Sequence, residues 1–273
     1  MIKVLHIKNS YKFRVINFLL LICQKLPFPI MENNITRHTL LKSIVLHLLP
    51  GILGGICFYI LSPIVKANGF PTIMALIISG IIILIPFESG FLIYQKKVTG
   101  QNLYYGVNQY FKTIPFWQYL LFIPLIVLIA GILFKILGFT STFLMTFFKW
   151  MPSDTILDMG LNSSLTKSKL LFTYLLFLPF LVFVLPTIEE FYFRGYLLPR
   201  MPGKLKGWTE ITHSGLFALY HTWTPWMFVV RTFGVLPLIY LVKRKENLIL
   251  GIVAHCLLNS IDFIIGLIFI LKM

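Results

Sequence analysis

The 273-residue chain has few charged residues, and acidic ones are the scarcest. Charged residues make up 12% of the chain, with nine acidic side chains against 24 basic ones, whereas apolar residues make up 58%. This composition excludes an ordinary soluble domain. Several uninterrupted apolar runs approach or exceed the roughly 20 residues that cross a hydrocarbon core of about 30 Å. The chain is therefore predicted to be an integral membrane protein.

Several familiar chemical signatures are also missing. The chain has three cysteines, Cys23, Cys57 and Cys256, and no CxxC pair, which excludes a disulfide framework and a zinc knuckle. There is no HExxH, no Walker loop and no GxSxG. The net charge of +15 does not point to nucleic acid, because Lys and Arg gather between apolar runs, where they set topology and meet anionic headgroups.

The apolar runs are continuous rather than alternating, and a spanning segment must satisfy its own backbone polar groups. We therefore predict an all-α fold, a polytopic transmembrane helix bundle of about seven spans plus interfacial helices. The fifth span is short and polar and could instead re-enter the membrane. The expected spans are 40–65, 71–95, 115–138, 168–195, 208–223, 225–243 and 248–271.

The chain divides into three predicted parts: a basic, interfacial N-terminal segment (1–38), N-terminal transmembrane helices with an outer loop (39–165), and a C-terminal transmembrane core (166–273). Basic clusters follow spans two, four and six, and a fourth lies at the N-terminus. Seven alternating spans place all four clusters on one side, which should be cytoplasmic. The N-terminus is thus predicted to be cytoplasmic.

Polar side chains inside the apolar runs concentrate in the last four spans. A charged group there costs about 2.5–3.5 kcal/mol, so such residues usually pair, face a cavity or carry function. The first three spans offer little besides His47 and Glu88. The later set is Glu189, Glu190, Arg194, His213, His221, Arg231, His255, Asn259 and Asp262.

The stretch TIEEFYFRGYLL, residues 187–198, holds two adjacent glutamates. Glu190 and Arg194 are separated by four residues and share a helix face, so they are expected to form an ion pair. Glu189 points elsewhere and has no local partner. Burial disfavours the ionised form of a lone carboxylate, which suits a general base working near neutrality. Alternatively, both glutamates only mark the end of a helix.

His255 and Asn259 also share one helix face. As two donors, they could stabilise an oxyanion. One glutamate and two histidines also resemble a zinc ligand set with an open fourth position, and the residues alone do not decide between these roles. At about 1.5 Å per residue, Glu189 and His255 lie at similar depths, some 14 and 12 Å from the basic ends of their helices. Arg231 and Asp262 are predicted to form a structural ion pair.

Three motifs occur in order on these spans: EEFYFR fits EExxxR, FALYH fits FxxxH and HCLLN fits HxxxN. Together they resemble the CPBP family of intramembrane proteases, also called the Abi or type II CAAX-protease family. The resemblance covers about residues 168–270 and makes the C-terminal part the catalytic core. It implies that Glu189 activates water, that His221 positions the water, and that His255 and Asn259 stabilise the oxyanion. Glu190 and Arg194 would be supporting residues.

The expected function is therefore an intramembrane endopeptidase, with CAAX-type or bacteriocin-immunity-type processing as candidates. The family has been described both as metal-dependent and as glutamate-dependent. A metal-free site is favoured here because Asn259 is a poor zinc ligand, and zinc, if bound, would use Glu189, His221 and His255. The expected partners are the lipid bilayer and a peptide or protein that is membrane-associated or prenylated. The alternatives are a non-catalytic immunity or scaffold protein of the same fold and a transporter, whose inverted repeats are not seen. A bacterial plasma membrane is the expected location.

Overall fold

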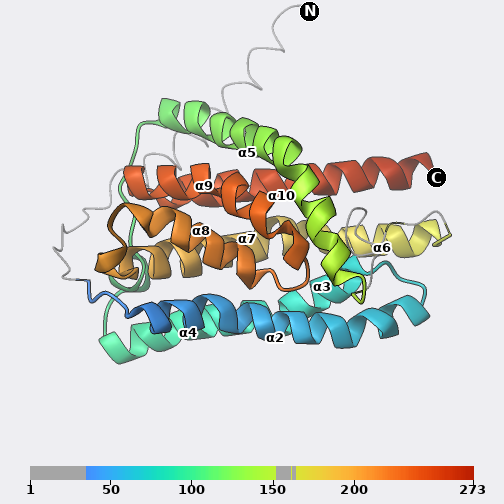
Figure 1. The fold of residues 1–273 in the computed structure, drawn as a ribbon, viewed down its shortest axis with the longest axis horizontal. Helices are drawn as coiled ribbons and strands as arrows, with labels where there is room; N and C mark the ends of the chain where they lie inside the picture. Colours follow the sequence, from blue (N-terminus) through green and yellow to red (C-terminus); the bar gives the residue numbers. More distant parts are fainter. Residues whose placement is uncertain (1–34, 152–160, 162–163) are drawn as a thin grey trace, which may run out of the picture. The chain divides into compact units, whose positions relative to one another are not determined.

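The computed structural model describes residues 35–151, 161 and 164–273, so the predicted N-terminal segment lies almost wholly outside this part, as does much of the outer loop. The described residues fold into helices and form no named strand (Figure 1). The α-helices are α2 (Leu40–Ala67), α3 (Ile73–Ser79), α4 (Ile85–Thr99), α5 (Phe116–Met145), α6 (Lys167–Phe177), α7 (Leu185–Glu189), α8 (Thr209–Tyr220), α9 (Phe228–Lys245) and α10 (Leu248–Lys272).

Several of these helices are joined through π-helical or 3-10 turns. The π-helical segments are η1 (Gly80–Leu84), η2 (Leu103–Val107), η5 (Leu178–Val184) and η6 (Glu190–Leu197). The 3-10 segments are η3 (Thr146–Phe148), η7 (Leu198–Arg200), η8 (Gly203–Trp208) and η9 (Pro225–Met227). As a result α3 runs through η1 into α4, and α6 runs through η5, α7 and η6 to Arg200.

Six helical stretches in the described part are long and apolar enough to cross a membrane: Leu40–Ala67, Ile73–Thr99, Phe116–Phe148, Lys167–Arg200, Pro225–Lys245 and Leu248–Lys272. The all-α prediction is confirmed, and the count agrees roughly with about seven spans. The expected fifth span is α8, whose twelve residues rise only about 18 Å and cannot cross the core alone. The expected third span continues past residue 138 to Phe148.

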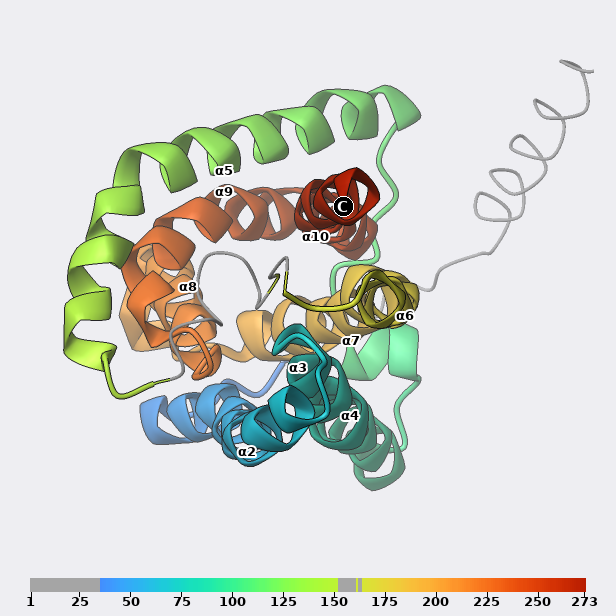
Figure 2. The same cartoon turned by 90° about the vertical axis from the view of Figure 1, so that its right-hand side faces the viewer.

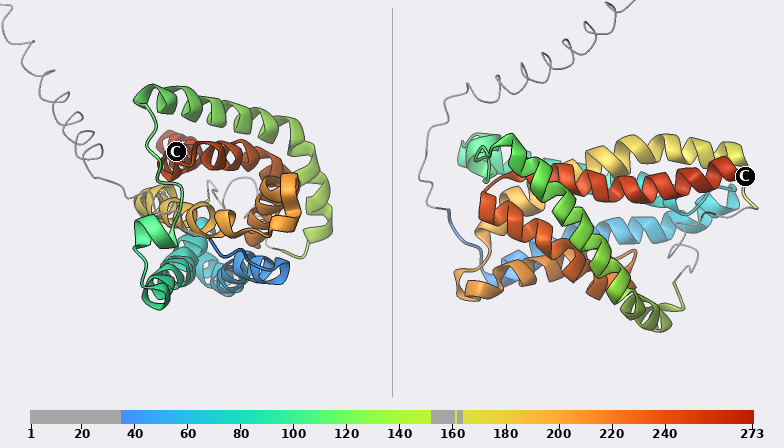
Figure 3. Two further views of the ribbon diagram at one scale, coloured as in Figure 1. Left: turned by 90° about the vertical axis from the view of Figure 1, so that its left-hand side faces the viewer. Right: turned by 90° about the horizontal axis from the view of Figure 1, so that it is seen from above.

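Within residues 35–273, α5 runs obliquely across α9 and α10, while α2 and α4 lie on the opposite side of α7 (Figures 1 and 2). The views from the other end and from above agree on this arrangement (Figure 3). The basic segments meet at one end of the bundle. The His38 amide donates to the Arg200 carbonyl at 2.7 Å, and Lys243 pairs with Glu210 at 2.7 Å. The residue before α2 is thus tied to the end of span four, and the end of span six is tied to the start of α8; that this end is cytoplasmic stays a prediction.

Helix ends follow ordinary capping chemistry. The Thr39 hydroxyl accepts the Lys42 amide at the start of α2, and Asn247 Oδ1 accepts the Leu250 amide at the start of α10. Asn247 also donates its side-chain amide to the Lys112 carbonyl at 2.7 Å, which ties the start of α10 to the segment before α5. α10 therefore enters the bundle at a fixed position, and this sets the height of the HxxxN motif.

Two glycines of α2 let the end of α8 approach closely. A Cβ on Gly51 would overlap the Tyr220 carbonyl, and one on Gly55 would overlap the Thr222 hydroxyl. The Thr222 hydroxyl donates to the Gly51 carbonyl at 2.6 Å. α8 ends at Tyr220, and His221 follows with φ −78° and ψ 61°, outside the helix. Small residues commonly let membrane helices approach this closely. Here they fix the turn that carries Tyr220 and His221.

Candidate active site

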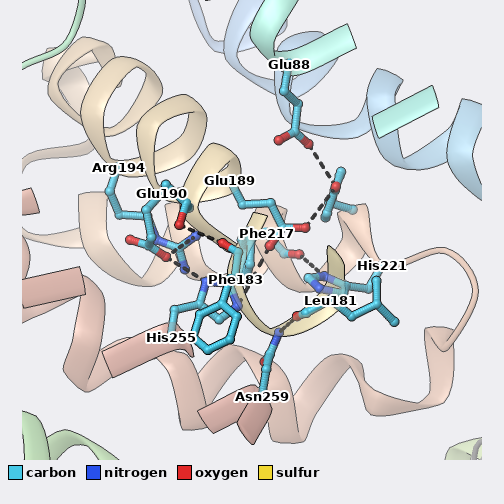
Figure 4. A network of polar contacts seen from close by, with 12 residues as sticks. Glu88, Leu181, Phe183, Glu189, Glu190, Arg194, Phe217, His221, His255 and Asn259 are labelled. Atoms are coloured by element: carbon cyan, nitrogen blue, oxygen red, sulfur yellow. Dashed lines mark hydrogen bonds and ion pairs between the residues drawn. The ribbon is translucent and has the colours of Figure 1, made fainter. Parts of the chain in front are cut away.

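The residues of the three motifs converge from α7, η6, the end of α8 and α10 (Figure 4). The glutamates and the arginine are almost inaccessible, with Glu189 exposed by 3% and Glu190 and Arg194 by 0%. The His255 side chain keeps 12% of its surface. The predicted cluster of motif residues is therefore a buried polar group inside an otherwise apolar bundle.

The predicted ion pair of the EExxxR motif is present. Arg194 Nη1 lies 3.2 Å from Glu190 Oε1, and both side chains are fully buried. The guanidinium also lies over the Phe217 ring, 3.9 Å from its centroid. A cation held over an aromatic face gains electrostatic attraction that is largest when both are removed from water. The phenylalanine of the FxxxH motif thus holds the arginine of the EExxxR motif.

His255 lies between the two glutamates. Its Nδ1 is 2.9 Å from Glu190 Oε1, and its Nε2 is 3.8 Å from Glu189 Oε2, which is too long for a direct hydrogen bond. Gly251, one turn earlier on α10, makes this approach possible, because a Cβ there would be 2.7 Å from Glu190 Oε2. The sequence assigned Glu190 to Arg194 alone. The structure corrects this, since Glu190 also orients His255.

Asn259 is held by a backbone carbonyl that the irregular helix leaves free. In the π-helical segment the Leu185 amide bonds to the Phe180 carbonyl, so it does not bond to Leu181. The next possible donor is Pro186, which has no N–H. The Leu181 carbonyl accepts the side-chain amide of Asn259 instead, at 2.8 Å. This contact uses one of the two hydrogens that the Asn259 side-chain amide carries.

The tautomer of His221 follows from its one hydrogen bond. Its Nδ1 lies 2.8 Å from the Phe217 carbonyl, which can only accept, so Nδ1 carries a proton. In the neutral ring Nε2 is then an acceptor. Such a nitrogen can accept a hydrogen bond from water but cannot donate to an oxyanion. This chemistry matches the role of positioning water that the motif resemblance implies for His221.

Two residues that the motifs do not include complete the cluster. The Tyr220 hydroxyl lies 3.1 Å from Glu189 Oε1 and 2.8 Å from Glu88 Oε1. Glu88 comes from α4 and is fully buried. Glu189 therefore has no hydrogen-bond partner on its own helix among the described residues, yet it is bound by Tyr220 at the end of α8, which also contacts Glu88. Glu88 was visible in the sequence as a rare charge in an early span, but nothing there connected it to Glu189.

The predicted ion pair between Arg231 and Asp262 is not formed. Asp262 lies on the exposed side of α10, and Arg231 instead donates to the Thr224 hydroxyl at 3.1 Å. The two charges still attract each other at longer range. The error came from matching depth alone, because two residues at equal depth can face different directions on their helices.

The sequence left open a zinc site formed by Glu189, His221 and His255. Among the described residues, no three or more His, Cys, Asp and Glu side chains are arranged to hold a metal ion. Glu189, His221 and His255 do not form such a group in the described part of the chain, and a metal-free site stays a prediction. His255 Nδ1 is held by Glu190 and His221 Nδ1 by the Phe217 carbonyl, while His255 Nε2 lies 3.8 Å from Glu189 Oε2.

Comparison with known proteins agrees with the motifs. Residues 171–261 match the family model of Rce1-like type II CAAX prenyl endopeptidases. This region is similar to that family, and it is called the Rce1-like region below. The match contains all three motifs, so the resemblance is confirmed over this part of the chain. No curated protein and no solved structure matches. Together with the six apolar helices, the Rce1-like region supports an integral membrane protein of the intramembrane protease kind, acting on a peptide or protein in the membrane.

Proposed function

We propose that this protein is an intramembrane endopeptidase in which Glu189 is the general base. The observation that carries the proposal is the placement of the Glu189 carboxylate. It is 3% exposed, it makes no salt bridge shorter than 3.8 Å among the described residues, and Oε2 faces His255 Nε2. A carboxylate in such a site can take a proton from water as the water attacks a peptide carbonyl. His221 Nε2 accepts a hydrogen bond from the same water.

The oxyanion formed by this attack needs donors. Asn259 offers the second hydrogen of its amide. His255 offers Nε2–H only as an imidazolium, because Nδ1 already donates to Glu190 at 2.9 Å. In the proposed step, the water oxygen bonds to the carbonyl carbon, Glu189 takes one water proton, and the negative charge forms on the former carbonyl oxygen beside His255 and Asn259.

The proposed substrate is a membrane-associated peptide or protein, with CAAX-type prenylated tails and bacteriocin-immunity-type processing as the two candidate classes. The proposed reaction uses no metal, because Asn259 is a poor zinc ligand and a good oxyanion donor. The proposed location is a bacterial plasma membrane with the basic end of the bundle in the cytoplasm.

The test is turnover by the purified protein in lipid vesicles, with a prenylated CAAX peptide and an unprenylated membrane-spanning peptide as probes. Products are identified by mass spectrometry in ¹⁸O water, which labels the new carboxylate after hydrolysis. Glu189→Gln keeps the shape of the side chain and should lower turnover about 10²–10⁴-fold. Glu210→Gln, which changes a glutamate on the first turn of α8 paired with Lys243, is the matched control and should retain activity.

Two results would count against the proposal. If folded Glu189→Gln cleaves as fast as the wild type, Glu189 is not the base. If the wild type cleaves no peptide, the result favours a non-catalytic immunity or scaffold protein. Adding a chelator tests the metal-free reaction, which should continue unchanged. Loss of activity that added zinc restores would overturn that part of the proposal.

A further inference from the structure

Tyr220 joins two carboxyl groups that are far apart in the sequence. Its hydroxyl lies 2.8 Å from Glu88 Oε1 on α4 and 3.1 Å from Glu189 Oε1 on α7. Figure 4 shows Glu88 directed toward Glu189 across this contact. α4 lies outside the Rce1-like region, so Glu88 enters the site from a part of the chain that carries none of the motifs.

The number of hydrogens limits how these three groups can bond. A tyrosine hydroxyl has one hydrogen to donate and lone pairs to accept, whereas an ionised carboxylate only accepts. Tyr220 can therefore donate to one carboxylate but not to both. Two short contacts are both satisfied only if one of the carboxyl groups is protonated and donates to the tyrosine oxygen. If both carboxylates were ionised, an oxygen of one of them would face a lone pair of the Tyr220 oxygen with no hydrogen between them.

Glu88 is the group that carries this proton. It is fully buried, no cation lies within 4 Å of it among the described residues, and its Oε2 has no hydrogen-bond partner. Arg194 attracts it through space, but that arginine is already bound to Glu190 at 3.2 Å. Glu189, in contrast, faces His255 Nε2 at 3.8 Å. Burying an unpaired carboxylate is far more costly than burying a neutral acid.

We propose that Glu88 is a positioning residue of the hydrolytic site, held as a neutral acid that donates to Tyr220 so that Tyr220 donates to Glu189. This chain of hydrogen bonds fixes Glu189 Oε1 and leaves Oε2 turned toward His255, where the general base must act. The inference rests on the proposed function of Glu189. In this role Glu88 acts through Tyr220, by holding the base in one orientation.

Three single variants and one double variant test the role by kinetics. Glu88→Gln keeps a neutral donor for Tyr220 and should keep most of the activity. Glu88→Ala removes the donor and should lower kcat by about 10–100-fold with KM little changed, since a small misplacement of a catalytic group can cost this much. Tyr220→Phe should have a similar effect, and the double change to Ala and Phe should be no worse than either alone, because both act through one chain of contacts.

The outcomes separate a positioning role from a structural one. If folded Glu88→Gln is as inactive as Glu88→Ala, a charged carboxylate is required and the proposal fails. If Glu88→Ala retains full kcat, or if its loss lies in KM, Glu88 does not position the base. Additive losses for the Ala and Phe changes would break the link through Tyr220.

A second measurement does not depend on activity. The infrared difference spectrum between the wild type and Glu88→Gln in lipid at neutral pH should contain the carbonyl stretch of a protonated carboxylic acid. Its absence overturns the neutral-acid state of Glu88 even if the protein proves to be an active protease. Its presence supports that state even if Glu189→Gln shows that Glu189 is not the base, so the two failures are distinguishable.

Discussion

Replacing Glu190 by Gln should destabilise the protein more than any exposed charge change. Glu190 and Arg194 are both fully buried, and their closest atoms are 3.2 Å apart. Removing one partner of such a pair leaves an uncompensated buried charge and typically costs about 3–5 kcal/mol. Glu210→Gln is the control, because Glu210 and Lys243 form a closer pair, at 2.7 Å, whose side chains are 21% and 34% exposed. Exposed pairs contribute about 1 kcal/mol or less.

The measurement is the free energy of unfolding of each variant in the same lipid and detergent mixture, followed by helix circular dichroism. The double variant Glu190→Gln with Arg194→Met removes both charges and should be more stable than Glu190→Gln alone. If Glu190→Gln differs from the wild type by no more than the Glu210 control does, the pair contributes little. A double variant less stable than Glu190→Gln would show that the buried arginine does not depend on Glu190.

Two further changes test how the backbone supports the site. Gly251→Ala puts a Cβ 2.7 Å from Glu190 Oε2, and it should lower the free energy of unfolding by about 1–3 kcal/mol and also lower kcat. The control is Gly131→Ala, whose Cβ would have nothing within 4 Å and which should be neutral or slightly stabilising. Equal stability of the two variants would refute the close approach of α10. Pro186→Ala restores an N–H that can compete with Asn259 for the Leu181 carbonyl, so kcat should fall while KM is retained. Pro237→Ala in α9 is the control and should leave kcat unchanged. Equal kcat for these two variants would show that the Leu181 carbonyl does not position Asn259.

Much of the fold could be predicted from hydropathy, because long apolar runs determine where a membrane helix forms. The limits of α5 and α8 could not. α5 continues to Met145, beyond residue 138 where the third span was predicted to end, and α8 ends at Tyr220 after twelve residues. Its end is fixed by the packing of Gly51 and Gly55 of α2 against the following turn, a tertiary contact that no local pattern reveals.

Contacts of the site could be predicted where the two residues are close together in the sequence. The contact of Glu190 with Arg194 follows from i, i+4 spacing on one helix, and the structure contains it. The contact of Glu190 with His255 joins residues 65 positions apart and depends on the absence of a side chain at Gly251. The resemblance named His255 but did not supply the group that orients it. Glu88 was missed for the same reason, since its partner Tyr220 lies 132 residues away.

The charges of the cluster explain why a neutral Glu88 suits a membrane interior. The cluster brings three carboxyl groups, those of Glu88, Glu189 and Glu190, close to the Arg194 guanidinium, so a third ionised carboxylate would add negative charge that this arginine does not balance. Uncompensated charge in such surroundings is strongly unfavourable. In the proposed reaction Glu189 becomes neutral as the oxyanion appears beside His255, so negative charge moves within the cluster while its total stays the same. A low-dielectric site can stabilise this step with little reorganisation, because the donors are already in place before the water attacks.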